Sequence, residues 1–68
     1  MKTTPIKTIY DEIDSQNRQL VWTAYKDGSA MTREITRHLE HACSARETYR
    51  ETHSAGSDAA RMIHAMPG

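Results

Sequence analysis

The chain has a single cysteine, Cys43, so it can form no disulfide bond within itself. Structural disulfides are typical of small secreted domains, so their absence fits a cytoplasmic setting. Hydrophobic residues make up only 37% of the 68 residues, and no run of them is long enough to span a membrane. The first residues also lack the apolar segment of a signal peptide. The sequence therefore predicts a cytoplasmic protein that does not contact a membrane.

Glycine and proline are scarce, with three and two residues, and nine basic residues balance nine acidic ones. The charges are spread evenly, whereas nucleic acids attract proteins with a clustered positive surface. A chain of this length buries little apolar surface and is often stabilised by oligomerisation. The composition favours a helical, oligomeric protein and lowers the expectation of nucleic-acid binding.

Apolar residues in the N-terminal half are separated by helical steps of three and four positions. They are Ile6, Ile9, Tyr10, Ile13, Leu20, Val21 and Ala24. Thr4 and Pro5 suit the start of a helix, and Gly28 suits the position after its end. The pattern predicts a first helix over about 5–26.

A second apolar stripe follows, at Met31, Ile35, Leu39, Ala42 and Tyr49. No glycine or proline interrupts residues 29–55, so a second long helix is predicted there. Two helices joined by a tight turn form an antiparallel hairpin. "SAGSD" at 54–58 permits a short third helix or a frayed tail over about 57–66. The sequence thus predicts one all-α domain, a helical hairpin that assembles into an oligomeric bundle.

Three of the four histidines and the cysteine lie in "HLEHACSARETYRETH", residues 38–53. On one helix His38 and His41 are neighbours, but Cys43 points about 140° away from His38. His53 lies roughly 22 Å further along the axis. Because zinc needs three or four converging ligands, we expect no metal site and no cofactor. Cys43 has no base within reach on such a helix, so we also expect no catalytic residues and no enzymatic activity.

Arg46 and His53 fall on the same helical face as the apolar stripe. Buried charges need partners, and the polar residues of the first helix supply them. The hypothesis is a polar seam of Asp14, Asn17, His38 and Arg46, in which Arg46 pairs with Asp14. Two interpretations remain open, a structural layer inside a bundle and a recognition groove. Because histidines titrate near neutral pH, assembly through this face is expected to loosen toward pH 5–6.

A second stripe on the first helix joins Arg18, Trp22 and Tyr25 on its outer side. Trp, Tyr and Arg dominate the energetics of protein interfaces, although single aromatic residues on a surface are ordinary. The predicted protein interface comprises Arg18, Trp22, Tyr25, Arg46, Tyr49 and His53.

Together these features predict a non-enzymatic interaction protein that binds another protein through helical faces. It would be an adaptor, inhibitor or regulatory subunit of the phage or plasmid type. We expect it to form a homodimer or a higher oligomer. The alternative is a small dimeric DNA-binding regulator that contacts phosphates through Lys26, Arg33 and Arg37. A helix-turn-helix alignment on Gly28 is weak, because it puts Glu34 and Arg37 where apolar residues are needed.

Overall fold

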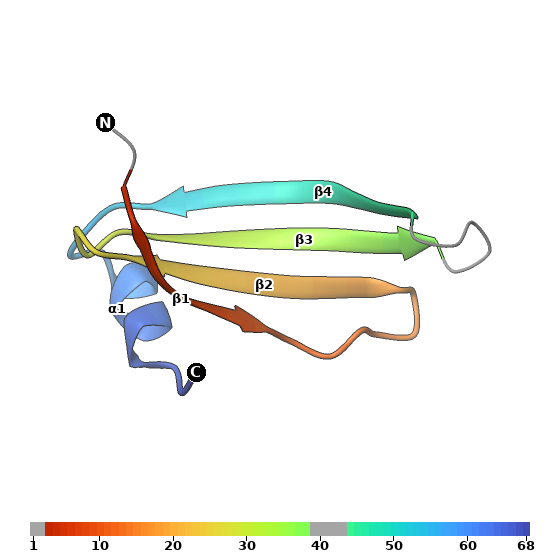
Figure 1. Cartoon of the computed structure of the whole chain (residues 1–68), viewed down its shortest axis with the longest axis horizontal. Coiled ribbons are helices and arrows are strands. Elements are labelled where there is room, and N and C mark those ends of the chain that lie inside the picture. Colours follow the sequence, from red (N-terminus) through yellow and green to blue (C-terminus); the bar gives the residue numbers. More distant parts are fainter. Residues whose placement is uncertain (1–2, 39–43) are drawn as a thin grey trace.

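The computed structural model describes residues 3–38 and 44–68, except for the side chain of His38, and shows an antiparallel sheet followed by one helix (Figure 1). The sheet has four strands, which lie side by side in the order of the chain. The elements are β1 (Pro5–Tyr10), β2 (Arg18–Tyr25), β3 (Ala30–His38), β4 (Ser44–His53) and α1 (Asp58–Ala65).

The prediction of an all-α helical hairpin bundle is therefore wrong. The segment 5–26 forms β1, a loop and β2, and the segment 29–55 contains β3 and β4. The physical reason is clearest in β2, where "LVWTAY" is rich in aromatic and β-branched residues. Val21 and Ala24 are fully buried, yet they point to opposite faces of the sheet. An apolar run that is buried on both faces is compatible with helical spacing, so periodicity alone could not separate the two structures.

The turn at Gly28 joins two strands, not two helices. The N–H of Tyr25 donates to the carbonyl of Ser29, which closes a loop over residues 26–28. Gly28 has φ +93°, a left-handed conformation that glycine adopts without strain. Asp27 accepts hydrogen bonds from the backbone N–H and the hydroxyl of Ser29. These bonds lower the pKa of Asp27, and the hydroxyl of Ser29 is the main cause.

The loop between β1 and β2 is organised by the carboxylate of Asp14. It accepts hydrogen bonds from the backbone N–H groups of Gln16 and Arg18, at 2.8 and 2.9 Å. Asn17, between them, has φ +62° and so lies in the left-handed region, where asparagine is tolerated better than most residues. Its carbonyl accepts from the N–H of Arg37, which ties the loop to β3.

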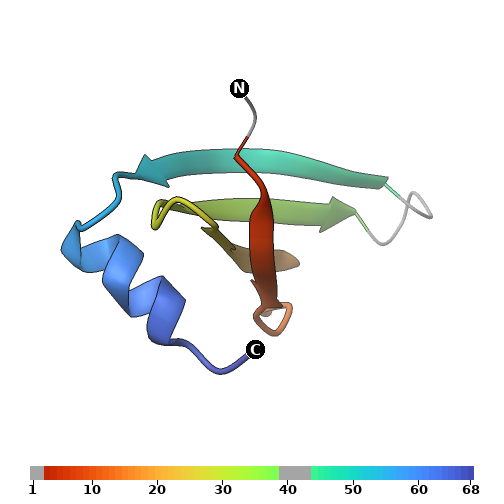
Figure 2. The same ribbon diagram turned by 60° about the vertical axis from the view of Figure 1, so that its left-hand side comes forward.

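The C-terminal segment, where the sequence left a helix and a frayed tail open, forms α1. The Ser57 hydroxyl accepts from the N–H of Ala60 and caps its start. Figure 2 shows α1 against one face of the sheet, at the end where β2 and β3 meet. The small core there contains Ala24, Ala30, Ala60 and Ile63, with Trp22 and Met66 packed beside it.

Lys7 connects β1 to the end of α1. Its ammonium group donates to the carbonyls of His64 and Met66, a favourable position for a cation at a helix C-terminus. In the described ranges, no helix is long and apolar enough to cross a membrane.

Candidate functional site

The face of the sheet opposite α1 is hollowed. Residues from all four strands line one shallow depression, namely Pro5, Thr8, Thr23, Tyr25, Met31, Arg33 and Arg50. Since β1 and β4 are the two edge strands, the sheet must curve toward this side, and Figures 1 and 2 show β1 crossing the direction of β3 and β4. We call this side the concave face and the other side, which carries α1, the helix face.

Cross-strand register assigns each residue to a face, because directly opposite residues point the same way. Trp22 is opposite Thr32, and Ala24 is opposite Ala30, on the helix face. Val21 is opposite both Tyr10 and Arg33, and Thr23 is opposite both Thr8 and Met31. These neighbours place Val21 and Thr23 on the concave face.

Val21 and Thr23 form the floor of the concave face, with exposed fractions of 0% and 6%. No helix covers them among the described residues, so the longer side chains around them exclude the solvent. At the rim, Tyr10 is 62% exposed. Across the hollow the Tyr25 hydroxyl lies 3.9 Å from the sulfur of Met31. The concave face thus combines a buried floor of valine and threonine with aromatic and thioether side chains that a ligand can touch.

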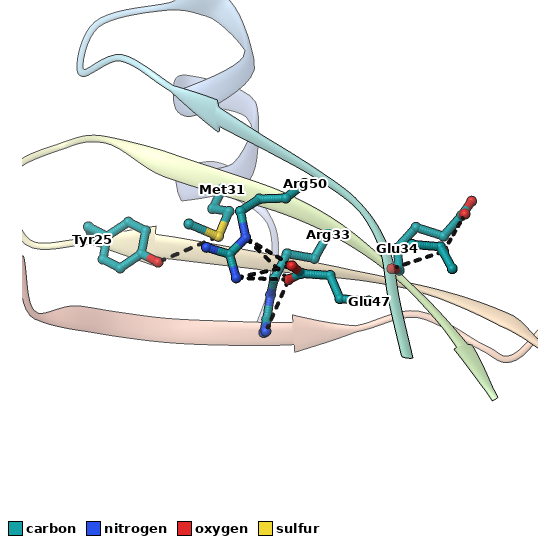
Figure 3. Close-up of polar contacts among 7 residues, drawn as sticks. Tyr25, Met31, Arg33, Glu34, Glu47 and Arg50 are labelled. Atoms are coloured by element: carbon teal, nitrogen blue, oxygen red, sulfur yellow. Dashed lines mark hydrogen bonds and ion pairs between the residues drawn. The ribbon is translucent and has the colours of Figure 1, made fainter. Parts of the chain in front are cut away.

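A cluster of two arginines and one glutamate lies in the concave face (Figure 3). The Glu47 carboxylate accepts hydrogen bonds from Nε and Nη2 of Arg50, at distances of 3.1–3.2 Å. Arg33 approaches the same carboxylate, with Nη1 4.0 Å from Oε1. The Nε of Arg33 is buried and has no acceptor among the described residues. Unsatisfied buried donors are uncommon in native structures.

A β-bulge in β4 creates this cluster. Glu34 is opposite Tyr49, and the next residue, Ile35, is opposite Glu47, so Thr48 is an extra residue. Its hydroxyl donates to the Glu34 carboxylate at 2.8 Å. The extra residue brings Glu47 and Arg50 to the same face, although side chains three positions apart in a regular strand point to opposite faces.

Arginine is in excess over acidic residues on the concave face. Arg37 is two positions from Ile35 along β3, and its guanidinium donates to the side-chain oxygen of Gln19 at 2.6 Å. The strand positions of the concave face therefore carry three arginines, at 33, 37 and 50, and one carboxylate, Glu47. The whole chain has a formal charge of zero, so this face is locally positive and suited to an anionic group.

The predicted stripe of Arg18, Trp22 and Tyr25 does not form one surface. In a strand, side chains alternate between faces. Arg18 and Trp22 lie on the helix face, and Tyr25 points to the concave face. Trp22 packs beside the core under α1. Trp22 is therefore partly buried by packing in the fold, and its part in an interface stays a prediction.

Arg46, Tyr49 and His53, the other predicted interface residues, lie on the helix face of β4. Arg46 is opposite Thr36, and His53 makes a 2.8 Å hydrogen bond with the Thr32 hydroxyl. The Tyr49 hydroxyl donates to Glu51, and this bond raises the pKa of Tyr49. The three share a face, as predicted, but on a strand.

The predicted polar seam of Asp14, Asn17, His38 and Arg46 is not found. Asp14 forms its ion pair with Arg18 at 3.5 Å, four positions along the chain, and not with Arg46. The backbone N–H of Arg18 is the main cause of a lowered pKa of Asp14. Asn17 belongs to the same loop, and the side chain of His38 lies outside the described residues. The predicted loosening of assembly at pH 5–6 was argued from the helical seam, and it stays a prediction.

Of the residues predicted to contact phosphate, Arg33 and Arg37 share the concave face. Lys26 lies in the loop after β2, where its N–H donates to the Thr4 carbonyl. Arg50 was missed, because its place in the cluster depends on the bulge at Thr48, which periodicity does not show.

The histidine and cysteine stretch lies partly outside the described residues, which exclude His41 and Cys43. Within the described ranges, no group of three or more His, Cys, Asp or Glu side chains could hold a metal ion. Comparisons of the chain with known protein families, curated proteins and solved structures return no match. The concave face, defined by its geometry alone, is the candidate functional site.

Proposed function

We propose that this chain is a non-enzymatic interaction protein, an adaptor, inhibitor or regulatory subunit, that binds an acidic segment of another protein in its concave face. The binding surface is a face of the sheet and not a helical face, since the helices predicted for that role are strands. We also propose that the chain associates with copies of itself, because its own core is small.

The observation that carries this proposal is that, among the described residues, no second layer of secondary structure covers the concave face. A sheet normally packs each apolar face against a second layer. Here α1 provides that layer on the helix face only, and Val21 is buried on the other side by side chains alone. A partner that covers Tyr10, Tyr25 and Met31 would complete the missing layer.

The charge of the concave face supports an acidic partner. Arg33 and Arg50 share the single carboxylate of Glu47, which leaves positive charge in the hollow. A carboxylate of the partner can accept from Arg50, whose side chain is 57% exposed. Charge-assisted hydrogen bonds to arginine are among the stronger polar contacts in interfaces.

Photo-cross-linking in the native host tests this proposal. A photoreactive amino acid replaces Tyr10 on the concave face, and a control variant carries it in place of Met62, which is 68% exposed on α1. We expect the probe at 10 to form one discrete adduct with another protein, with an acidic segment at the linked site. An equal pattern from both positions, or no adduct at 10, would count against the concave face.

A second candidate is DNA binding through the same face, because Arg33, Arg37 and Arg50 lie on it together. Proteins can read nucleic acids with the face of a sheet. Titration with duplex and single-stranded DNA at low salt separates the two functions, since phosphate contacts are strongest there. Saturable binding that weakens with salt would favour the DNA function over the protein partner.

A further inference from the structure

The outer side of β4 is the most accessible edge of the sheet. β4 is the last strand in the order, and β3 is its one neighbour in the described part of the chain. It is also the longest strand, with ten residues, and all but His53 are exposed. α1 packs on β2 and β3 and leaves this edge open. An uncovered edge presents backbone N–H and C=O groups that can pair with another strand.

The other edge is less suited to pairing. β1 has only six residues and begins with proline. Proline has no backbone N–H to donate, so it weakens pairing at a sheet edge.

The charges of β4 are complementary to those of a second, antiparallel copy of β4. The strand "SARETYRETH" contains Arg-Glu at 46–47 and again at 50–51. With the symmetry axis between Thr48 and Tyr49, Arg46 lies opposite Glu51 of the second copy. In the same register Glu47 lies opposite Arg50 of the second copy. A shift of one position in either direction instead brings two arginines or two glutamates together, which is unfavourable.

The bulge at Thr48 makes this register geometrically possible. Opposite residues in an antiparallel pair must point to the same face, and residues five apart in a regular strand do not. In β4, Arg46 is opposite Thr36 and Glu51 is opposite Thr32, so both lie on the helix face. Glu47 is opposite Ile35 and Arg50 is opposite Arg33, so both lie on the concave face. Without the extra residue, the paired side chains would point to opposite faces of the sheet. With it, each arginine and its opposite glutamate point to the same face.

We propose that two copies of the chain pair through the outer edge of β4, in the register that joins Arg46 to Glu51 and Glu47 to Arg50 of the second copy. Two four-stranded sheets then form one continuous sheet. Its two concave faces open on the same side, with their arginine–glutamate clusters adjacent at the centre. This inference specifies the self-association part of the proposed function and does not depend on what the concave face binds.

Charge reversal tests the pairing with matched variants. One variant carries Arg46→Glu and Arg50→Glu, and the other carries Glu47→Arg and Glu51→Arg. In a homodimer of either variant, every charged residue at these positions lies opposite a residue of the same charge. We expect the dissociation constant of that homodimer to rise by roughly tenfold or more. Mixed together, the two variants are complementary at all four positions and should form a heterodimer. A swap control, Arg46→Glu with Glu51→Arg, keeps opposite charges in the register and should remain a dimer.

Sedimentation velocity across micromolar concentrations provides the measurement, with circular dichroism to show that each variant is folded. We expect the wild-type chain to reach twice its 7.7 kDa mass. A monomeric wild-type chain would overturn the proposal. Dimers of both reversed variants, or a mixture that stays monomeric, would also overturn it.

A disulfide test checks the register even where a reversed variant fails to fold. In a Cys43→Ala background, Arg46→Cys and Glu51→Cys lie opposite each other between copies and should form a linked dimer on mild oxidation. Arg46→Cys with Arg50→Cys is the control, because these positions are not opposite in the proposed register. Equal linkage of both pairs would contradict the register. The concave-face adduct at position 10 does not depend on either result, so the two proposals fail separately.

Discussion

Glu47 and Arg50 lie three residues apart on β4, and yet their side chains meet on one face of the sheet at 3.1 Å. The relationship exists because Thr48 is an extra residue in the strand. It gives the concave face its central carboxylate, and the same bulge makes the edge of β4 complementary to itself.

Inserting an alanine between Thr48 and Tyr49 should separate Glu47 from Arg50. A one-residue change in register moves every following side chain to the opposite face. We expect the free energy of unfolding to fall by about 1–3 kcal/mol, as is typical when packed groups are misplaced. Urea denaturation measures this loss, and Thr48→Ser, which keeps the residue count and the hydroxyl, is the control. An insertion variant as stable as the wild type would mean that the spacing of Glu47 and Arg50 does not contribute to stability.

The packing of α1 can be tested with two neighbouring residues. Ile63 is 4% exposed and belongs to the core, whereas Met62 is 68% exposed. We expect Ile63→Ala to destabilise the fold by about 2–4 kcal/mol and Ile63→Val by about 1 kcal/mol. Met62→Ala should change stability by less than about 0.5 kcal/mol. Thermal and urea unfolding compare the three, and equal effects at 62 and 63 would contradict the orientation of the helix.

Asn17 should tolerate glycine and reject a β-branched residue. Its φ of +62° lies in the left-handed region, which valine adopts only with strain. We expect Asn17→Val to cost about 1–2 kcal/mol in unfolding free energy, and Asn17→Gly to be close to neutral. A valine variant as stable as the glycine variant would place Asn17 in an ordinary conformation.

Acid should weaken the fold through Asp14 and Asp27. Hydrogen bonds in the folded state lower the pKa of both carboxyls. Their contribution to stability is therefore present above the unfolded pKa and is lost as the pH falls below about 4, through the folded pKa. Unfolding measured from pH 6 to pH 3 should show a steeper loss for the wild type than for the Asp14→Asn, Asp27→Asn variant. Parallel curves would exclude these two groups as the cause.

The sequence located the turn at Gly28 better than the elements on either side of it, and it missed the loop between β1 and β2. Gly28 was recognised as a left-handed position, and the segments before and after it were expected to be antiparallel. The left-handed conformation of Gly28 and the antiparallel arrangement are both present, but the two segments are strands and not helices. The dipeptide Asp27-Gly28 between two segments rich in β-branched and aromatic residues was the available signal for a hairpin.

The candidate site was harder to predict. Arg33 and Arg37 were grouped correctly, because side chains four apart share a face in a strand as they nearly do in a helix. Trp22 and Tyr25, three apart, were grouped by the helical period and in fact point to opposite faces. Arg50 could not be placed without the bulge, and a bulge leaves no mark in hydrophobic periodicity.

The central claim is that the concave face binds an acidic protein segment, and an affinity measurement with the cross-linked partner tests it most directly. Isothermal titration would compare the wild-type chain with Tyr10→Ala on the concave face and Met62→Ala on α1. We predict that Tyr10→Ala weakens binding by about tenfold or more, as expected for a contacting aromatic residue, while Met62→Ala leaves the Kd unchanged. The opposite order of effects would show that the partner binds on the helix face and would contradict the account.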